Sequence, residues 1–206
     1  MAARKPSGTK RIPISQLASI ASKSVKGRDP RTLRPPTGPT KARVLGVDPG
    51  SRVTGYGIVE INGTRLTHVA SGIIKAYKPG VTFEDRLVTI HKELDALIKL
   101  HKPDAAAAEG VFTHRNAQSA LKLGHARGVV LLTARLNNLS VAEYAPTRIK
   151  QAVVGHGSAD KTQVQKMISM LLGIPAPKKL DTSDALAIAI CHLHSLAPGR
   201  MFGGLG

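Results

Sequence analysis

The dipeptide Asn62-Gly63 constrains the fold more than any other feature of this sequence. It lies between two runs that are typical of strands, residues 55–61 and residues 66–77, and Asn-Gly between such runs is a strong signal for a tight β-hairpin. A short apolar run at residues 44–47 precedes the hairpin and ends at Asp48-Pro49-Gly50. We therefore expect the sheet to begin with antiparallel strands.

The rest of the chain alternates helical and strand patterns. Apolar residues recur at helical spacing in some segments and form short buried runs in others. The predicted helices are 82–100, 116–136, 147–153, 160–172 and 182–195, and the predicted strands are 105–108 and 141–144. The order β-β-β-α-β-α-β-α-α-α predicts an α/β fold, a mixed five-stranded sheet with helices packed on both faces.

Residues 1–43 differ in composition from the rest. The chain has 206 residues and a formal net charge of +17, and this segment holds eleven basic residues against one acidic residue, Asp29. It also contains six prolines and little apolar surface, which predicts a disordered basic arm. The arm is a solvated tail, a segment with non-specific affinity for nucleic acid, or an organellar transit peptide. The folded domain is then expected at residues 44–196, followed by a short flexible tail at 197–206.

The composition excludes several classes of protein. The excess of positive charge predicts a polyanionic partner, whereas aromatic residues at 3% and the absence of Trp argue against an aromatic-rich binding module. No apolar run approaches the roughly 20 residues that span a bilayer, and the N-terminus lacks a secretory signal. The single cysteine, Cys191, excludes a disulfide framework and is expected to be inert. We therefore expect a reducing compartment.

Four carboxylates stand where their side chains would be unfavourable unless used. Asp48 and Glu109 each follow an apolar strand, and ligands in open α/β sheets bind beyond the carboxyl ends of the strands. Asp181 and Asp184 stand three residues apart at the start of an apolar helix, so both project from one face. The alternatives are a turn residue for Asp48, a solvated strand end for Glu109 and a helix cap for Asp181.

Convergent carboxylates repel one another, and in a chain this basic the simplest compensation is divalent cations bound through oxygen. Two Mg²⁺ ions roughly 3.5–4 Å apart stabilise both the attacking and the leaving oxygen of an in-line phosphoryl displacement. A basic surface beside such a cluster predicts a metal-dependent nuclease.

Three further residues are candidates for contacts with DNA. Lys150 and Lys161 flank a flexible stretch at 155–158 that suits a phosphate backbone, although a lone lysine is more often solvated. Ser158 in that stretch is a candidate N-cap for the helix that follows. Phe112 lies in a predicted loop, where an exposed aromatic ring stacks on a base with about 1–3 kcal/mol, or else it anchors the core.

Five blocks of sequence between about residues 44 and 194 resemble the RuvC family of bacterial Holliday-junction resolvases. They occur in order and at compatible spacing: DPGSRVTGYG at 48–57, EGVF at 109–112, ALKLG at 120–124, KQAVVG at 150–155 and DTSDALA at 181–187. The resemblance implies a ribonuclease H-like fold and Mg²⁺- or Mn²⁺-dependent nicking of two opposed strands at a four-way junction, in recombination and repair. It implies a homodimer, with the branch-migration proteins RuvA and RuvB as partners. It also implies the bacterial cytoplasm, at the nucleoid, as the location, with an organelle as the lesser alternative.

The same resemblance implies roles for individual residues. The four carboxylates Asp48, Glu109, Asp181 and Asp184 match the catalytic, metal-binding positions. Lys150 and Lys161 match positions that contact DNA, and Phe112 matches an aromatic residue that stacks on a base at the junction. Gly110 departs from the pattern, because a larger polar residue is expected there. The arm before Val44 lies outside the match.

Two other functional classes compete with the nuclease. Asp48-Pro49-Gly50-Ser51 also resembles the phosphate loop of actin-like and Hsp70-like ATPases, a class built from two repeated halves in a much longer chain. A non-catalytic protein that bends or bridges nucleic acid would have no use for carboxylates beside phosphate.

A small-residue ridge marks the long helix at 116–136. Ala117, Ala120, Gly124 and Gly128 recur at helical spacing, and glycine inside a helix costs roughly 0.5–1 kcal/mol relative to alanine. The ridge is expected to form a two-fold dimer contact, or to pack against the protein's own sheet.

Overall fold

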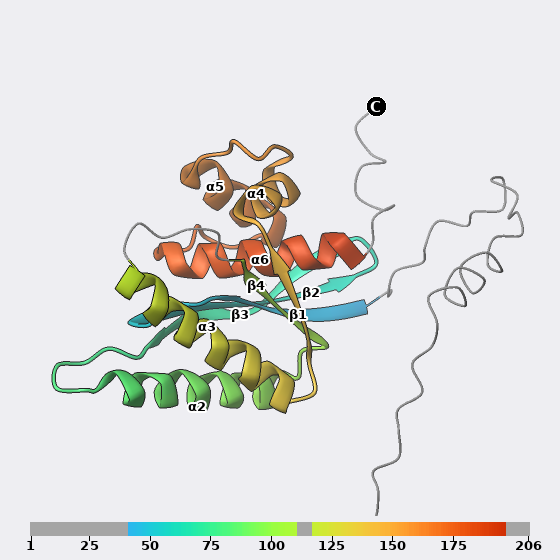
Figure 1. Cartoon of the computed structure of the whole chain (residues 1–206). Coiled ribbons are helices and arrows are strands. Elements are labelled where there is room, and N and C mark those ends of the chain that lie inside the picture. Colours follow the sequence, from blue (N-terminus) through green and yellow to red (C-terminus); the bar gives the residue numbers. More distant parts are fainter. Residues whose placement is uncertain (1–40, 111–116, 197–206) are drawn as a thin grey trace, which may run out of the picture. The chain divides into compact units, whose positions relative to one another are not determined.

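The computed structural model of this chain describes residues 41–110 and 117–196 (Figure 1). The N-terminal arm up to residue 40, Phe112 and the tail at 197–206 lie outside the described residues. None of the helices in the described ranges is long and apolar enough to cross a membrane.

Five strands form one mixed sheet in the order β3-β2-β1-β4-β5. The hairpin predicted at Asn62-Gly63 is present, and Gly63 has a φ of 62°, a left-handed conformation that glycine adopts without strain. The first three strands are antiparallel neighbours, whereas β4 pairs parallel with β1 and β5 pairs parallel with β4. The strands are β1 (Lys41–Asp48), β2 (Val53–Asn62), β3 (Arg65–Lys75), β4 (Ala105–Glu109) and β5 (Ser140–Tyr144).

The first strand begins at Lys41, three residues before the predicted start at Val44. Lys41 and Arg43 pair with the end of β2, and both form ion pairs with Glu60, at 3.5 Å and 2.8 Å. The prediction that the arm extends to residue 43 is therefore wrong for its last three residues. Their basic composition matches that of the arm, but a partner on the adjacent strand fixes them.

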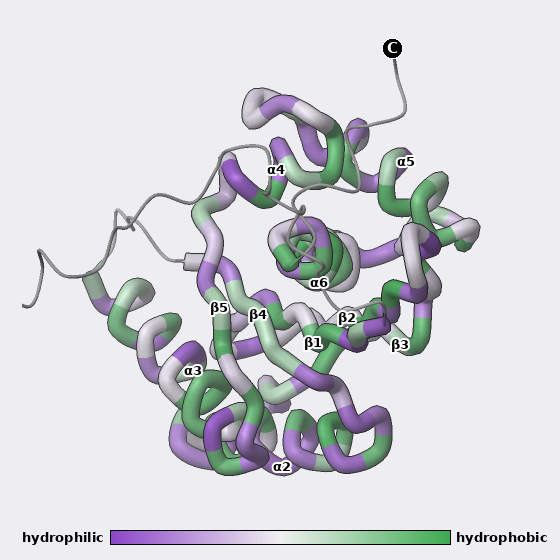
Figure 2. The backbone as a smooth tube through the Cα atoms, turned by 90° about the vertical axis from the view of Figure 1, so that its right-hand side faces the viewer, coloured by the Kyte–Doolittle hydropathy of each residue, from purple (hydrophilic) through white to green (hydrophobic). Residues whose placement is uncertain are grey.

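Helices cover both faces of the sheet, as predicted (Figure 1). One face carries α2 (Phe83–His101) and α3 (Ala117–Leu136). The other carries α6 (Leu180–Leu196), which is covered in turn by α4 (Pro146–Val154) and α5 (Lys161–Leu172). Figure 2 shows the mostly apolar α6 enclosed between the sheet and these two short helices, which explains why eleven of its seventeen residues are buried.

Three glycines allow α6 to approach the sheet backbone directly. A Cβ atom at Gly46 of β1 would lie 2.1 Å from the carbonyl oxygen of Ala185, and one at Gly57 of β2 would lie 2.8 Å from the amide nitrogen of Leu186. A Cβ atom at Gly55 would lie 2.0 Å from the carbonyl oxygen of Asp181. Close backbone approach at these glycines therefore sets how near α6 lies to β1 and β2, in addition to the packing of its apolar side chains on the sheet.

The small-residue ridge on α3 faces away from the sheet. Ala117, Gly124 and Gly128 are exposed, and a Cβ atom added at either glycine would have no neighbour among the described residues within 4 Å. The helix packs inward instead through a face that includes Ala126 and Val130. The alternative that the ridge packs on the protein's own sheet is wrong, because these larger side chains occupy that place.

Candidate active site

Two of the four carboxylates stand at the ends of adjacent parallel strands. Val47 of β1 pairs with Ala108 of β4, so Asp48 and Glu109 follow in register at the carboxyl edge of the sheet. The turn after Asp48 is fixed by Thr54, whose Oγ1 donates to the carbonyl oxygen of Gly50 at 2.8 Å and accepts from its amide at 3.3 Å. The end of β1 therefore holds Asp48 on an ordered turn.

The first two turns of α6 bring the other two carboxylates to the same place. Asp48 pairs across the sheet with Gly55, and the backbone of Asp181 lies directly against Gly55. Asp184 follows one turn later. Because α6 begins at Leu180, Asp181 is the second residue of the helix and does not occupy the N-cap position. The helix-cap alternative for Asp181 therefore does not hold.

We refer to these four residues as the carboxylate cluster, and burial raises the pKa of three of them. Desolvation, with the negative charges of Asp184, Glu109 and Asp181, raises the pKa of Asp48 to about 7. Burial and the charge of Asp184 also raise the pKa of Glu109. The pKa of Asp184 is raised by burial and, less strongly, by Asp181. Burial is the largest cause in each of the three, and neighbouring carboxylates add to it.

The donor set of the cluster suits a hard divalent cation. All donors are carboxylate oxygens, the ligands that Mg²⁺ prefers, and their mutual repulsion is what a cation would relieve. Within the described residues, however, no three acidic, His or Cys side chains are gathered tightly enough to hold an ion as they stand. The repulsion that contributes to the raised pKa of Asp48 also keeps the carboxylates apart. The side chains must therefore move toward one another when an ion binds.

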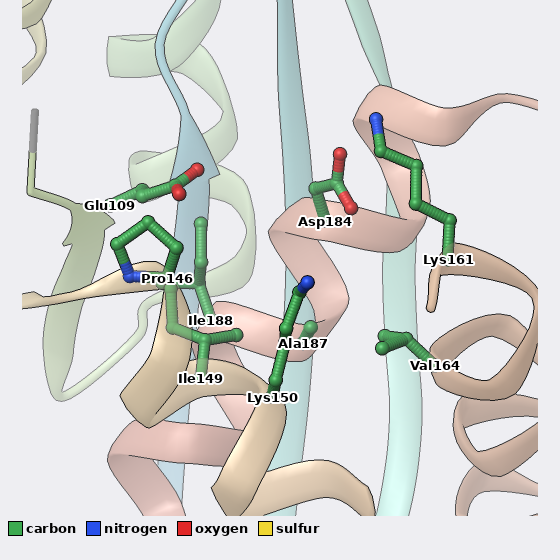
Figure 3. Close-up of a pocket in the computed structure, with 9 residues that line it drawn as sticks. All are labelled: Glu109, Pro146, Ile149, Lys150, Lys161, Val164, Asp184, Ala187 and Ile188. Atoms are coloured by element: carbon green, nitrogen blue, oxygen red, sulfur yellow. The ribbon is translucent and has the colours of Figure 1, made fainter. Parts of the chain in front are cut away.

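A pocket of about 230 Å³ opens beside the cluster and contains both predicted lysines (Figure 3). Glu109 and Asp184 line it together with Lys150 of α4 and Lys161 of α5, over a floor that includes Ile149 and Ile188. Both lysines lower the pKa of Glu109 and of Asp184, against the effect of burial. The pocket therefore presents carboxylates and ammonium groups to the same space.

The helix that carries Lys161 begins at a different cap from the one predicted. The N-cap of α5 is Asp160, whose side chain accepts from the amide of Gln163 at 2.8 Å while Gln163 Oε1 accepts from the amide of Asp160 at 2.9 Å. This capping box satisfies two backbone donors, which a serine two residues earlier cannot reach. The prediction that Ser158 caps the helix is wrong, and Lys161 is the first residue of α5.

Gly110, the departure from the family pattern, ends β4 with a backbone contact. Its amide donates to the carbonyl oxygen of Tyr144 at 2.9 Å, which extends the pairing of β4 with β5 by one bond beyond Glu109.

Cys191 is buried, and burial raises the pKa of its thiol to about 11, as expected for an inert cysteine.

Sequence reasoning missed a group of cations on the other side of Asp181. Arg52, Lys75 and Lys179 line a second pocket with Asp181 and Tyr77. Arg52 belongs to the block at 48–57, but no spacing in the sequence connects it with Lys75 or Lys179. The pairing of β2 with β3 and the position of α6 bring the three together.

Comparison with known proteins gives consistent matches. A family model described as crossover junction endodeoxyribonuclease RuvC matches residues 44–192. Relatives of that name in Pelobacter propionicus and Alkalilimnicola ehrlichii are 54% and 51% identical over 74% of this chain, which is 86% and 91% of their own lengths.

Solved structures agree with this match. Thermus thermophilus RuvC in complex with a Holliday junction substrate is 33% identical, with a TM-score of 0.73 over 77% of this chain and 97% of that one. The yeast mitochondrial Holliday junction resolvase, at 16% identity and a TM-score of 0.58 over 85% of this chain and 90% of that one, shares the fold.

Proposed function

The chain belongs to the RuvC family of crossover junction endodeoxyribonucleases, and from that membership we propose that it resolves four-way DNA junctions with the carboxylate cluster as its catalytic centre. The observation that supports this most directly is the convergence of the cluster. Two strand ends and one helix bring four carboxylates together, and burial and mutual repulsion raise the pKa of Asp48 to about 7. A protein does not maintain such a cluster for stability, because the repulsion disfavours the folded state.

We propose Mg²⁺ as the cofactor, two ions per site, with Mn²⁺ as a substitute. The four carboxylates of the cluster would hold the ions. Bound metal supplies the positive charge that activates a water molecule and stabilises the oxygens of the reacting phosphate. Asp48 and Glu109, on the rigid edge of the sheet, fix one side of the site, and the first two turns of α6 fix the other.

Lys150 and Lys161 provide positive charge beside the cluster. They face the pocket that Glu109 and Asp184 also line, and ammonium groups there attract a phosphate that the carboxylates alone would repel (Figure 3). Phe112, three residues beyond Glu109 in the sequence, is proposed to stack on a base at the junction. The basic arm is proposed to add affinity for DNA that does not depend on sequence.

We propose that the protein acts as a two-fold dimer through α3. The exposed side of this helix combines Gly124 and Gly128 with three leucines, Leu121, Leu132 and Leu136, whose exposed fractions are 62%, 57% and 63%. Apolar side chains of this size are unfavourable in water, and the glycines permit a second helix to approach closely. A four-way junction offers two equivalent strands, so a two-fold pair of sites nicks both.

The proposed setting follows from the substrate. DNA junctions of this kind arise during recombination and repair, and we propose that the protein acts on them in the bacterial cytoplasm, at the nucleoid. RuvA and RuvB are the proposed partners in branch migration.

A synthetic four-way junction tests the proposal. We expect paired, symmetric nicks in opposed strands when Mg²⁺ is present and binding without nicks when it is absent. Asp48→Asn serves as the inactive control on the same substrate. A shift of the junction without nicks under any metal condition would instead indicate a non-catalytic binding protein. ATP hydrolysis without nicking would indicate the actin-like class.

A further inference from the structure

A second pocket, of about 500 Å³, lies next to the carboxylate cluster on the side of β2 and β3. We call it the cation pocket and define it by Arg52, Lys75, Tyr77, Lys179 and Asp181. Along the carboxyl edge of β1, Glu109 lies on the β4 side of Asp48, whereas Arg52 and Lys75 lie on the β2–β3 side. The cation pocket and the lysine pocket therefore extend from the cluster in different directions.

The backbone of the cation pocket is held in place by hydrogen bonds. The carbonyl oxygen of Arg52 accepts from the amide of Ala76 at 3.1 Å and from the amide of Tyr77 at 3.0 Å. Val53 and Lys75 are paired residues at the ends of β2 and β3. The turn that carries Arg52 is therefore fixed to the segment that carries Tyr77, and the pocket does not depend on a free loop.

The Arg52 side chain is also oriented, by an aromatic ring. Its guanidinium lies over the ring of Tyr77 with Cζ 4.1 Å from the ring centroid, and Arg86 contacts the same ring at 4.5 Å. Arg86 is itself anchored, because its Nη2 donates to the carbonyl oxygen of Val81 at 3.1 Å. Stacking restricts the rotamers of Arg52 while its N–H donors stay available, since the ring face does not accept all of them.

The cations of the pocket have no carboxylate partner. Within residues 41–110 and 117–196, no acidic side chain lies within 4.0 Å of the charged nitrogens of Arg52, Lys75 or Lys179, although Asp181 lines the same pocket. Lys41 and Lys99, by contrast, are each paired with a carboxylate. Three cations and one carboxylate give the cation pocket a net charge of +2, which favours an anion.

We infer that the cation pocket binds a backbone phosphate of the DNA strand that the carboxylate cluster cleaves, at a distance from the scissile phosphate. Arg52 is the principal contact, Lys75 and Lys179 add positive charge, and Tyr77 positions the Arg52 guanidinium. The cation pocket on one side of the cluster, and Lys150 and Lys161 on the other, then hold the DNA strand across the carboxylates. These contacts keep the reacting phosphate in place although the carboxylates repel it. This inference rests on the proposed function, since it takes the strand to pass over the cluster.

The first test is the salt dependence of junction binding without divalent metal. Each phosphate contact that is lost reduces the slope of log K against log salt by about 0.9. We expect Arg52→Ala and Lys179→Ala to lower this slope, and Arg52→Ala to weaken binding on the order of tenfold, the usual effect of losing a hydrogen bond to a charged group. Lys92→Ala is the matched control, because Lys92 is an exposed lysine that does not line the cation pocket and lies on α2, on the face of the sheet opposite α6.

The Tyr77→Leu variant separates positioning from charge. It keeps all three cations but removes the ring contact, so we expect the salt slope to change little and the affinity to fall by about two- to fivefold. Melting temperatures of all variants in the same buffer verify folding. Should Arg52→Ala fail to fold, Arg52→Gln removes the charge while keeping most of the side chain.

The second test locates the phosphate. Junctions are made with single phosphates replaced by neutral methylphosphonates, and the wild-type protein is expected to lose affinity at one position away from the scissile bond. The Arg52→Ala variant should be insensitive at that position and normally sensitive elsewhere. Equal slopes for Arg52→Ala and Lys92→Ala, or equal methylphosphonate profiles for Arg52→Ala and wild type, would overturn the inference. If wild-type protein still nicks the junction in Mg²⁺, the proposed function survives that result.

Discussion

Replacing Asp48 by Asn should stabilise the metal-free protein. The folded state raises the pKa of this carboxyl from 3.8 to about 7 through burial and the charges of the other three carboxylates. Each pH unit of such a difference corresponds to 1.36 kcal/mol, so ionised Asp48 opposes folding by up to about 4 kcal/mol above pH 7. The Asn amide is isosteric and neutral but still partly desolvated, which reduces the expected gain to about 2–4 kcal/mol.

The gain should depend on pH in a defined direction. Because the folded pKa lies above the unfolded value, the wild-type protein has its full stability below pH about 4 and loses it as the pH rises to about 7. The advantage of Asp48→Asn is therefore largest at pH 8 and less than half as large at pH 5. At pH 8, Mg²⁺ should reduce the stability advantage of Asp48→Asn. An ion that binds the four carboxylates stabilises the wild-type protein, whereas the variant has lost one of the ligands.

Thermal unfolding in EDTA at pH 5 and pH 8 measures the effect. For a domain of this size we expect a rise in melting temperature of roughly 5–15 °C at pH 8. Glu93→Gln, which neutralises an exposed carboxylate on α2, should leave the melting temperature nearly unchanged at both pH values. An Asp48→Asn protein that is less stable than wild type at pH 8, or a gain that does not vary with pH, would refute the reasoning.

Three further predictions address function. Asp184→Asn should abolish nicking of labelled junctions in Mg²⁺, while junction affinity stays within a few-fold of wild type because cations supply the affinity. Parallel loss of nicking and binding would make Asp184 a structural residue. Deletion of residues 1–40 should leave the melting temperature and nicking intact but lower the salt slope of DNA binding, and an unchanged slope would show that the arm does not touch DNA. Gly124→Leu should give a folded monomer by sedimentation that binds the junction but makes only uncoordinated nicks, whereas an undisturbed active dimer would remove the α3 ridge from the interface.

The order of elements and the sheet were predictable because the sequence patterns are local. The Asn62-Gly63 turn, the apolar runs and the helical periodicities each reflect how a short segment meets the core. The placement of Asp48 and Glu109 at adjacent strand ends followed from the same patterns once β1 and β4 were taken as neighbours.

What could not be predicted depends on partners distant in the sequence. Lys41 and Arg43 look like the end of a basic arm until Glu60 is placed beside them. The cation pocket has the same origin, because Arg52, Lys75 and Lys179 meet only after β3 returns along β2 and α6 lies across the sheet. Whether the α3 ridge faced inward or outward was likewise undecidable, since α3 has apolar residues on all sides and no clear polar face.

The glycines under α6 limit how closely the two parts of the site can approach. One part is the strand ends with Asp48 and Glu109, and the other is the start of α6 with Asp181 and Asp184. At Gly46, Gly55 and Gly57 the backbone of α6 lies directly against the backbone of β1 and β2. Steric repulsion between these atoms prevents the helix from moving closer to β1. On its other side, α6 packs against side chains of α4 and α5, and His194 Nδ1 forms a 2.8 Å hydrogen bond with the backbone carbonyl oxygen of Ala152 in α4. Because the sheet leaves α6 no room to move closer to Asp48, we expect the cluster to tighten around an ion mainly by rotation of its side chains.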